Sequence, residues 1–116
     1  MEFLKQYWPM VLVAGWLGYK WYSFHKIKKM IPGLKKSGAV FIDVRSPAEY
    51  QMGHAEGSVN IPLNELSSHM NQIPQDKTLV VACASGTRSG LAKQMLKRHG
   101  HKTVYNAGNW TNMNEK

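Results

Sequence analysis

Cys83 is the only cysteine in the chain, and the residues that follow it are of the types that can activate a thiol. The segment reads Cys-Ala-Ser-Gly-Thr-Arg-Ser from Cys83 to Ser89. Its small residues, and Gly86 above all, allow successive backbone N–H groups to converge on one point. A thiolate at that point has a lowered pKa and reacts at neutral pH without a general base. The segment therefore predicts a nucleophilic Cys83, although a lone cysteine can also be an inert core residue.

Other residues of the segment have roles in the same prediction. Arg88 carries a planar guanidinium that can bind an anionic substrate through two parallel hydrogen bonds. Ser89 is expected either to cap the helix that follows or to form a hydrogen bond near the thiolate. The predicted substrate-binding residues are Ala84, Ser85, Gly86, Thr87 and Arg88.

Two elements must position this segment, a strand before it and a helix after it. Residues 78–82 form the continuous apolar run of a strand buried on both faces. Residues 88–99 carry apolar side chains at helical spacing, and Gly100 ends the helix. Further strands are predicted at 39–44, 59–61 and 102–106, with short helices at 47–52 and 63–70. Strands that alternate with helices predict a parallel α/β sheet, which binds ligands at the carboxyl ends of its strands.

Charged and imidazole side chains outside the segment have mainly structural interpretations. Asp43 and Arg45 follow or end a buried strand and are expected to support the site by pairing or by holding loops, with substrate contact as the alternative. His54 lies in a Gly-flanked turn and is expected to be a hydrogen-bonded structural residue. The histidines predicted at the surface, with no metal-ligand spacing among them, are His69, His99 and His101. Neither a metal site nor a cofactor is expected.

The net charge of +8 is concentrated near the N-terminus. Residues 1–36 contain seven lysines and one acid, whereas residues 37–116 contain eight lysines or arginines against six acids. A domain that binds nucleic acid would be expected to spread basic side chains over its folded face, so nucleic-acid binding is not expected. The 116 residues are enough for one domain, and one cysteine excludes an intramolecular disulfide.

The stretch from residue 6 to residue 24 is largely apolar and is uncharged except for Lys20. As a helix it would be about 28 Å long, close to the roughly 30 Å of a bilayer's hydrocarbon core. The aromatic residues that bracket it are Tyr7, Trp8, Trp21 and Tyr22. These features predict a single-pass anchor over residues 1–25 in the inner (cell) membrane, with lipid contacts through residues 3–24.

Five lysines follow this stretch, and the positive-inside rule then places the rest of the chain in the cytoplasm. Residues 26–37 are predicted to be a basic juxtamembrane helix or linker. The small-xxx-small spacing of Ala14 and Gly18 would allow a homodimer through the helix. The alternatives are a cleaved signal peptide, or a helix that is buried in a core or lies along the membrane surface.

Four motifs, taken together, resemble the rhodanese family of single-domain sulfurtransferases over roughly residues 38–110. The first is Ile42-Asp43-Val44-Arg45-Ser46-Pro47-Ala48-Glu49-Tyr50, and the second runs from Gly53 to Leu63. The third is the cysteine segment. The fourth, from Asn106 to Trp110, is most similar to that of small sulfurtransferases of the phage-shock type. Each motif alone is weak, but four in the right order are specific.

The resemblance implies that residues 38–116 have a rhodanese-like fold, an α/β parallel sheet flanked by helices. The transmembrane helix predicted from the apolar stretch would precede this domain. The resemblance also implies that Cys83 takes sulfane sulfur from a donor such as thiosulfate and becomes a persulfide. The amides of residues 84–88 would stabilise that persulfide, and cyanide or a thiol would accept the sulfur. Many family members carry a second basic residue where this chain has Ala84, so one anchoring charge for thiosulfate is missing.

Two other functions stay open at this point. One is a non-catalytic rhodanese-like module that binds a partner or carries sulfur at the membrane. The other is a phosphatase or arsenate reductase of similar fold. Four residues separate Cys83 from Arg88, which is the sulfurtransferase length and one residue shorter than the related phosphatase loop.

Overall fold

The computed structural model describes residues 2–114, with the side chains of residues 2–5, 7, 23 and 24 left out. Tyr7 of the predicted aromatic bracket therefore lies outside the described side chains, and residues 1, 115 and 116 lie outside the described chain. The elements are α1 (Glu2–Lys36), β1 (Val40–Asp43), α2 (Pro47–Met52), β2 (Val59–Asn60), η1 (Leu63–Gln72), β3 (Leu79–Cys83), α3 (Thr87–Arg98), β4 (Val104–Asn109) and η2 (Trp110–Asn114).

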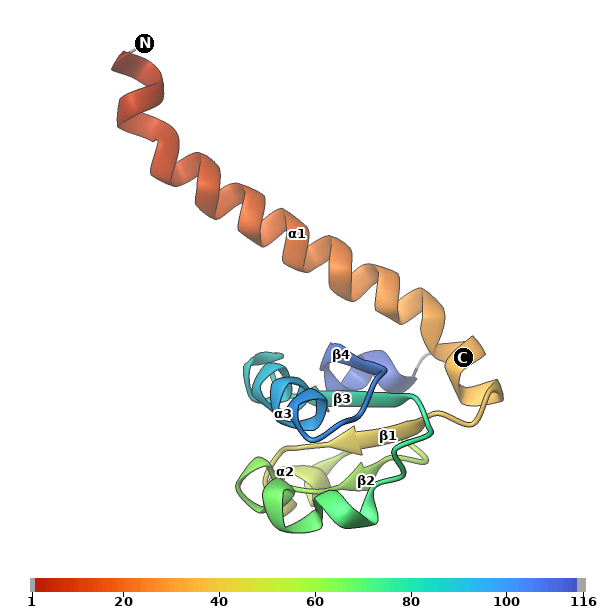
Figure 1. The fold of residues 1–116 in the computed structure, drawn as a ribbon. Coiled ribbons are helices and arrows are strands. Elements are labelled where there is room, and N and C mark those ends of the chain that lie inside the picture. The colour runs from red at the N-terminus through yellow and green to blue at the C-terminus, as the bar shows by residue number, and fades with distance from the viewer. Residues whose placement is uncertain (1, 115–116) are drawn as a thin grey trace.

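The four strands form one sheet in the order β2-β1-β3-β4, and every neighbouring pair is parallel. The predicted parallel α/β sheet is thus confirmed (Figure 1). All five residues of β3 are buried, as its continuous apolar run predicts. The strand is shifted by one residue toward the C-terminus from the predicted 78–82, so Cys83 itself belongs to the sheet.

The core is divided by the sheet into two clusters. Alternate residues of β3 point to opposite faces, with Val81 and Cys83 in one cluster and Val80 and Ala82 in the other. The first cluster is completed by apolar residues of η1 and α3, and the second by residues of α1 and η2. Cys83 therefore lies on the face of the sheet that α3 covers.

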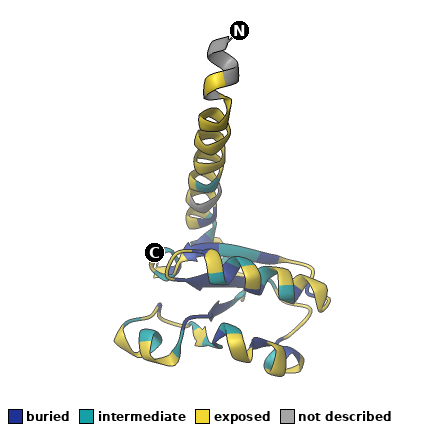
Figure 2. Cartoon of the chain, turned by 90° about the vertical axis from the view of Figure 1, so that its left-hand side faces the viewer, coloured by how far each residue is buried: buried dark blue, intermediate teal, exposed yellow. Residues whose placement is uncertain are grey.

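Helix α1 is one continuous helix from Glu2 to Lys36, and both Pro9 and Pro32 lie inside it. The segment predicted as a separate basic helix or linker at 26–37 is the last part of this helix, and it belongs to the folded core. Ile27 and Ile31 are buried in the second core cluster because α1 packs there against β4 and η2. The part before residue 26 extends away from the sheet and is exposed along most of its length (Figure 2).

No helix within residues 2–114 contains a stretch that is long and apolar enough to cross a membrane. The transmembrane helix predicted for residues 1–25 is therefore not supported. Gln6, Lys20 and the polar groups of the tyrosines and tryptophans lower the mean hydropathy of this segment.

Two smaller predictions are corrected by the structure. The helix predicted at 63–70 is the 3₁₀ helix η1, in which the Ser68 hydroxyl donates a hydrogen bond to the Glu65 carbonyl and competes with the backbone pattern. His101, predicted at the surface, is only 2% exposed. The backbone N–H of His101 donates to the Leu96 carbonyl in a turn after α3, in which Gly100 has a φ of +112°. This turn directs the His101 side chain inward.

Candidate active site

The sulfur of Cys83 lies at the carboxyl end of β3, where the chain turns into α3. The backbone N–H of Gly86 points at the Cys83 Sγ across 2.9 Å, and the N–H of Ser89 lies 3.5 Å from it. The positive end of the α3 dipole stands behind these amides. The arrangement is the converging set of N–H groups that the segment's small residues predict.

These contacts determine the ionisation of the thiol. Burial of the sulfur opposes ionisation and by itself raises the pKa of Cys83. The hydroxyl and N–H of Ser89, with the N–H groups of Ser85 and Gly86, act in the opposite direction and lower the net pKa below that of an ordinary thiol. Cys83 is therefore poised to ionise more readily than a free cysteine.

Gly86 makes the shortest of these contacts because of its backbone conformation. Its φ of +96° and ψ of −10° lie in the left-handed region, where a side chain would be strained. Gly86 also occupies the N-cap position of α3, and no side chain caps that helix. A residue other than glycine at this position would therefore disturb the amide that lies closest to the sulfur.

Two asparagines of β4 hold the loop from the outside. The Asn106 Nδ2 donates to the Gly86 carbonyl at 3.1 Å, and the Asn109 Nδ2 donates to the Ala84 carbonyl at 2.9 Å. Because these two loop carbonyls face β4 and accept its hydrogen bonds, the loop N–H groups can face the sulfur. Neither residue was predicted as a site residue. The available sequence signal is the motif from Asn106 to Trp110, which contains both asparagines.

Ser89 connects Asn106 to the sulfur. Its Oγ donates to the Asn106 Oδ1 at 2.6 Å and lies 3.4 Å from the Cys83 Sγ. Rotation about the Cβ–Oγ bond of Ser89 moves the hydroxyl hydrogen from the Asn106 Oδ1 toward the Cys83 Sγ. Of the two roles expected for Ser89, the structure favours the hydrogen bond near the thiolate, because Gly86 holds the N-cap position.

Arg88 does not point an open guanidinium at the sulfur site. Its Nη1 lies 2.8 Å from Oε1 of Glu49, and its Nη2 lies 3.0 Å from Oε2 of the same carboxylate. The two prongs predicted to bind a substrate are thus occupied by Glu49, a residue that was not predicted for the site.

Glu49 is itself held in place by the start of α2. The Ser46 hydroxyl accepts a hydrogen bond from the Glu49 N–H, and the Ser46 N–H donates to the Glu49 carboxylate in a capping box. Hydrogen bonds from Arg88 and then from Ser46 lower the pKa of Glu49 to about 2, so the carboxylate is charged at neutral pH. The Ser-x-x-Glu spacing is the sequence signal that could have located it.

Asp43 and Arg45 pair with each other, as predicted, through hydrogen bonds of 2.7–3.0 Å. Arg45 also donates to the Gly53 carbonyl at 2.7 Å, and its guanidinium lies 4.8 Å from the centre of the Trp110 ring. Asn60 binds the carbonyls of both charged residues. Together, Asp43, Arg45 and Asn60 connect the turn after α2 to the ends of β1 and β2. These contacts support α2, the helix that carries Glu49.

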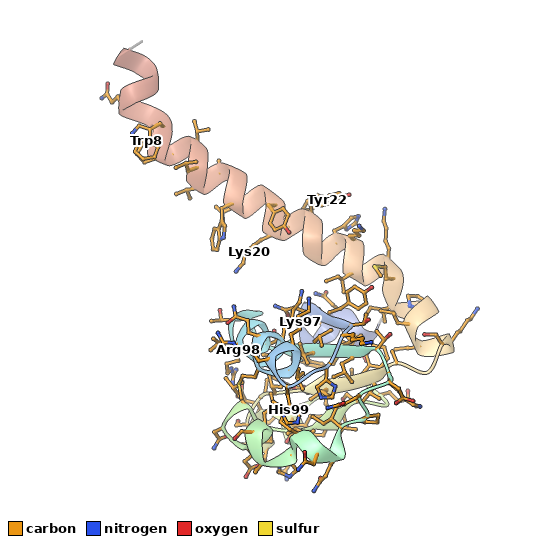
Figure 3. The ribbon with its side chains drawn as sticks, in the orientation of Figure 1. Trp8, Lys20, Tyr22, Lys97, Arg98 and His99 are labelled. Atoms are coloured by element: carbon orange, nitrogen blue, oxygen red, sulfur yellow. The ribbon has the colours of Figure 1, made fainter. Side chains whose placement is uncertain are left out.

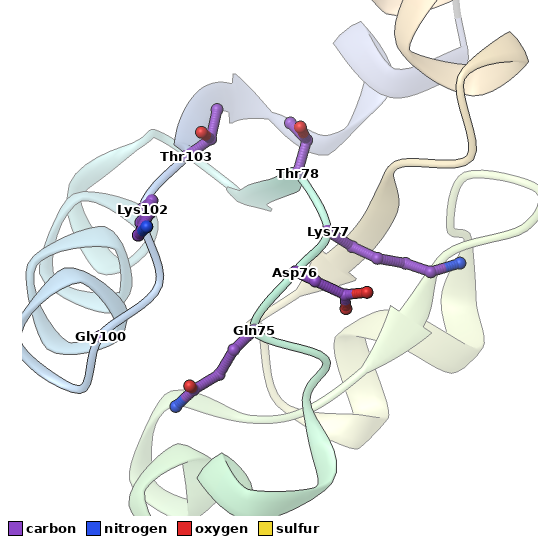
Figure 4. A pocket seen from close by; sticks show the side chains of 7 residues that line it. All are labelled: Gln75, Asp76, Lys77, Thr78, Gly100, Lys102 and Thr103. Atoms are coloured by element: carbon purple, nitrogen blue, oxygen red, sulfur yellow. The ribbon is translucent and has the colours of Figure 1, made fainter.

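The loop and its surroundings differ in exposure. Ala84, Ser85 and Thr87 are exposed, whereas Cys83 is buried beneath them. A hollow of about 470 Å³ lies elsewhere, among residues 75–78 and 100–103 (Figure 4). These residues precede β3 and β4, so the hollow is at the amino ends of the strands and does not include the sulfur.

The chain matches known proteins over most of its length. Residues 25–115 match the family model described as Rhodanese-like domain. The thiosulfate sulfurtransferase PspE of Escherichia coli is 43% identical over 70 residues, which cover 59% of this chain and 67% of PspE. The uncharacterized protein YqhL of Bacillus subtilis is 43% identical over 68 residues, covering 59% and 54%. The thiosulfate:glutathione sulfurtransferase of Saccharomyces cerevisiae is 31% identical over 99 residues, covering 72% and 68%.

Solved structures agree with these matches. A rhodanese with anions from E. coli has a TM-score of 0.60 and 36% identity, covering 65% of this chain and 91% of that one. A reduced Bacillus anthracis CoADR-RHD has a TM-score of 0.64 and 33% identity, covering 78% of this chain and 15% of that one. The chain thus spans only part of several relatives, including about half of YqhL.

Proposed function

The chain belongs to the rhodanese-like domain family, and on that premise we propose that it is a sulfurtransferase that works through a persulfide of Cys83. The observation that carries the proposal is the 2.9 Å contact between the Gly86 N–H and a Cys83 sulfur of lowered pKa. Sulfurtransferases among its relatives support it, and the E. coli and yeast relatives described above are both named for thiosulfate.

The first step is attack by the Cys83 thiolate on the outer sulfur of a donor such as thiosulfate. A bond forms between Sγ and that sulfur, and the sulfur–sulfur bond within thiosulfate breaks. Its electron pair leaves with sulfite, and the negative charge of the persulfide remains on the outer sulfur. The loop amides, of which those of Gly86 and Ser89 face Sγ before the reaction, would stabilise this charge.

The second step returns the enzyme to its thiolate. An acceptor such as cyanide or a thiolate attacks the outer sulfur of the persulfide, and the sulfur–sulfur bond breaks with its electrons on Sγ. Cyanide leaves as thiocyanate, and a thiolate leaves as a persulfide. The yeast relative is named for thiosulfate and glutathione, which makes glutathione a reasonable first thiol to test.

The proposal is tested by incubating the protein with thiosulfate and measuring its intact mass. We expect one added sulfur atom, which cyanide removes as thiocyanate. A Cys83→Ser variant should gain none, and a Ser67→Ala variant, changed on exposed η1, serves as the matched control. Absence of the adduct with several donors would refute the proposal. An adduct that no acceptor removes would favour the non-catalytic sulfur-carrier module.

We further propose that α1 attaches this domain to the cytoplasmic face of the cell membrane. Support comes from the large apolar side chains between residues 8 and 22, which are each more than half exposed and belong to the part of α1 that leaves the domain (Figure 3). Lysines at 20, 26, 29, 35 and 36 follow or interrupt them and would attract anionic headgroups.

Flotation with vesicles tests this attachment. The full chain should float with vesicles that contain anionic phosphatidylglycerol and less with vesicles of phosphatidylcholine alone. Removal of residues 1–24 should abolish flotation and leave the persulfide adduct intact. If the full chain instead stays in the vesicle-free fractions as a dimer, the apolar side chains of α1 pack against a second copy of the chain. The membrane proposal is then wrong.

A further inference from the structure

Arg88 is the only lysine or arginine between Cys83 and Ser89, so it is the only cation that the loop can offer to a donor. Both of its outer nitrogens bind the Glu49 carboxylate, at 2.8 and 3.0 Å. Ala84 adds no second positive charge. The guanidinium is therefore neutralised by a carboxylate before any substrate arrives.

The pair is also within reach of a substrate. The Arg88 and Glu49 side chains are 38% and 37% exposed, and Arg88 lies at the start of α3 beside the exposed loop. The two-pronged geometry is the strong arrangement for these groups, but its exposure leaves it open to competition from an anion. A donor that needs Arg88 must displace Glu49.

We infer that Glu49 is a specificity-determining residue, which by occupying Arg88 makes the site favour monoanionic sulfane-sulfur donors over dianionic thiosulfate. The inference rests on the proposed function. Attack of a thiolate on thiosulfate brings three negative charges together, whereas attack on a thiosulfonate anion brings two. With Arg88 neutralised, the additional charge of thiosulfate meets no free cation of the loop.

A thiosulfonate donor reacts by the same balanced step as thiosulfate. The Cys83 Sγ forms a bond to the terminal sulfur, the bond from that sulfur to the sulfonyl group breaks, and its electron pair leaves as a sulfinate. Methanethiosulfonate has a methyl group where thiosulfate has a charged oxygen. The ratio of the kcat/KM values for the two donors therefore measures the effect of one negative charge on the donor at nearly constant donor size.

The test measures kcat/KM for both donors, with cyanide as acceptor, in the natural protein and in Glu49→Gln. Glutamine keeps the length of the side chain and can still accept the Ser46 N–H through its amide oxygen. We expect kcat/KM for thiosulfate to rise about three- to fivefold, mainly through a lower KM, because Arg88 is released. The value for methanethiosulfonate should stay within about twofold.

Two control variants separate this effect from its alternatives. Glu56→Gln removes the same charge from an exposed turn before β2. Ser46→Ala breaks the capping box but leaves the carboxylate on Arg88. Neither variant should change the ratio of the two kcat/KM values. If Glu49→Gln changes both donors by the same factor, or leaves the ratio unchanged, the inference is overturned.

A second measurement does not depend on sulfur transfer. Uncharged iodoacetamide alkylates Cys83, and an anion bound at the loop slows this reaction. In Glu49→Gln, sulfate should protect three- to fivefold better than in the natural protein, with little change for methanesulfonate. Equal protection by sulfate in both proteins would contradict the role of Glu49. Failure of the proposed function would instead appear as the absence of a persulfide with either donor.

Discussion

The shortest contact to the reactive sulfur comes from a backbone amide, and the residue that provides it has no side chain. Substitution of Gly86 by alanine adds a Cβ in the left-handed region, at a cost of about 1–2 kcal/mol. Relief of that strain would move the N–H that now lies 2.9 Å from Sγ. A rise in the pKa of Cys83 and at least about tenfold slower persulfide formation are expected.

The pH dependence of Cys83 alkylation measures this pKa. Gly57→Ala is the matched control, because Gly57 also has a positive φ, of +83°, and lies in a turn away from the loop. It should lower stability by a similar amount and leave the alkylation profile unchanged. A Gly86→Ala variant with the profile of the natural protein would show that the amide does not control ionisation.

Asn106 acts on the sulfur through other residues, so it is a positioning residue. An Asn106→Ala change removes hydrogen bonds to the Gly86 carbonyl, the Ser89 hydroxyl and the Gly108 N–H. We expect the pKa of Cys83 to rise and kcat to fall more than KM changes. Asn112→Ala, which removes a hydrogen bond to the Ala107 carbonyl, is the control and should retain kcat. Equal kcat in both variants would contradict the role given to Asn106.

At the residue scale, the sequence predicts the cysteine and its loop but not the groups that hold them. Cys83 and Gly86 are only three positions apart in the chain, and local chemistry suffices to associate them. Glu49 meets Arg88 across 39 positions, and Asn109 meets Ala84 across 25. Such contacts follow from the order of strands in the sheet, which local patterns do not specify.

At the scale of elements, α1 has two parts with different energetic roles. Ile31 is fully buried against the sheet, whereas Leu12 on the same helix is 60% exposed. Ile31→Ala should lower the free energy of unfolding by about 2–4 kcal/mol, because it leaves a cavity in the second core cluster. Leu12→Ala should change it by less than about 0.5 kcal/mol. Denaturant titration measures both, and equal losses would refute the division.

The strands and α3 could be predicted from the sequence because each follows a local rule. Continuous apolar runs predict buried strands, and β1 and β3 agree with the prediction to within one or two residues. The continuity of α1 could not be predicted in this way. Pro32 suggests a kink, but the helix packs on the second core cluster through Ile27 and Ile31 before that proline and through Leu34 after it, so tertiary packing outweighs the local preference.

At the scale of the whole molecule, His101 makes the stability depend on pH. Neither ring nitrogen has a hydrogen-bond partner among the described residues. Burial and the nearby His99 lower the pKa of His101 from 6.5, and the Pro74 carbonyl opposes this without a well-formed hydrogen bond. Below pH 6.5 the unfolded chain therefore binds a proton on His101 that the folded chain excludes. The free energy of unfolding is unaffected by this proton above pH 6.5 and decreases as the pH falls below 6.5.

Thermal unfolding between pH 5 and 8 tests this dependence. A His101→Leu variant should lose part of the decrease in Tm below pH 6.5, whereas His69→Gln, changed at a less buried position on η1, should retain it. An identical slope of Tm against pH in the natural protein and in His101→Leu would show that other groups cause the acid sensitivity.

The family resemblance deduced from four motifs also concerns the whole molecule, and the family model confirms it over residues 25–115.

The dependence of the Cys83 loop on β4 also has a consequence for the order of synthesis. Asn106 and Asn109 follow the loop residues they hold by 20 and 25 positions, so a ribosome adds them after Cys83 has been made. At roughly 5–20 residues per second, the nascent chain carries an unassembled thiol for about one to several seconds. During that interval the loop amides that lower the pKa of Cys83 are not yet held in place by Asn106 and Asn109. The sulfur chemistry of Cys83 can therefore mature only after β4 has been made.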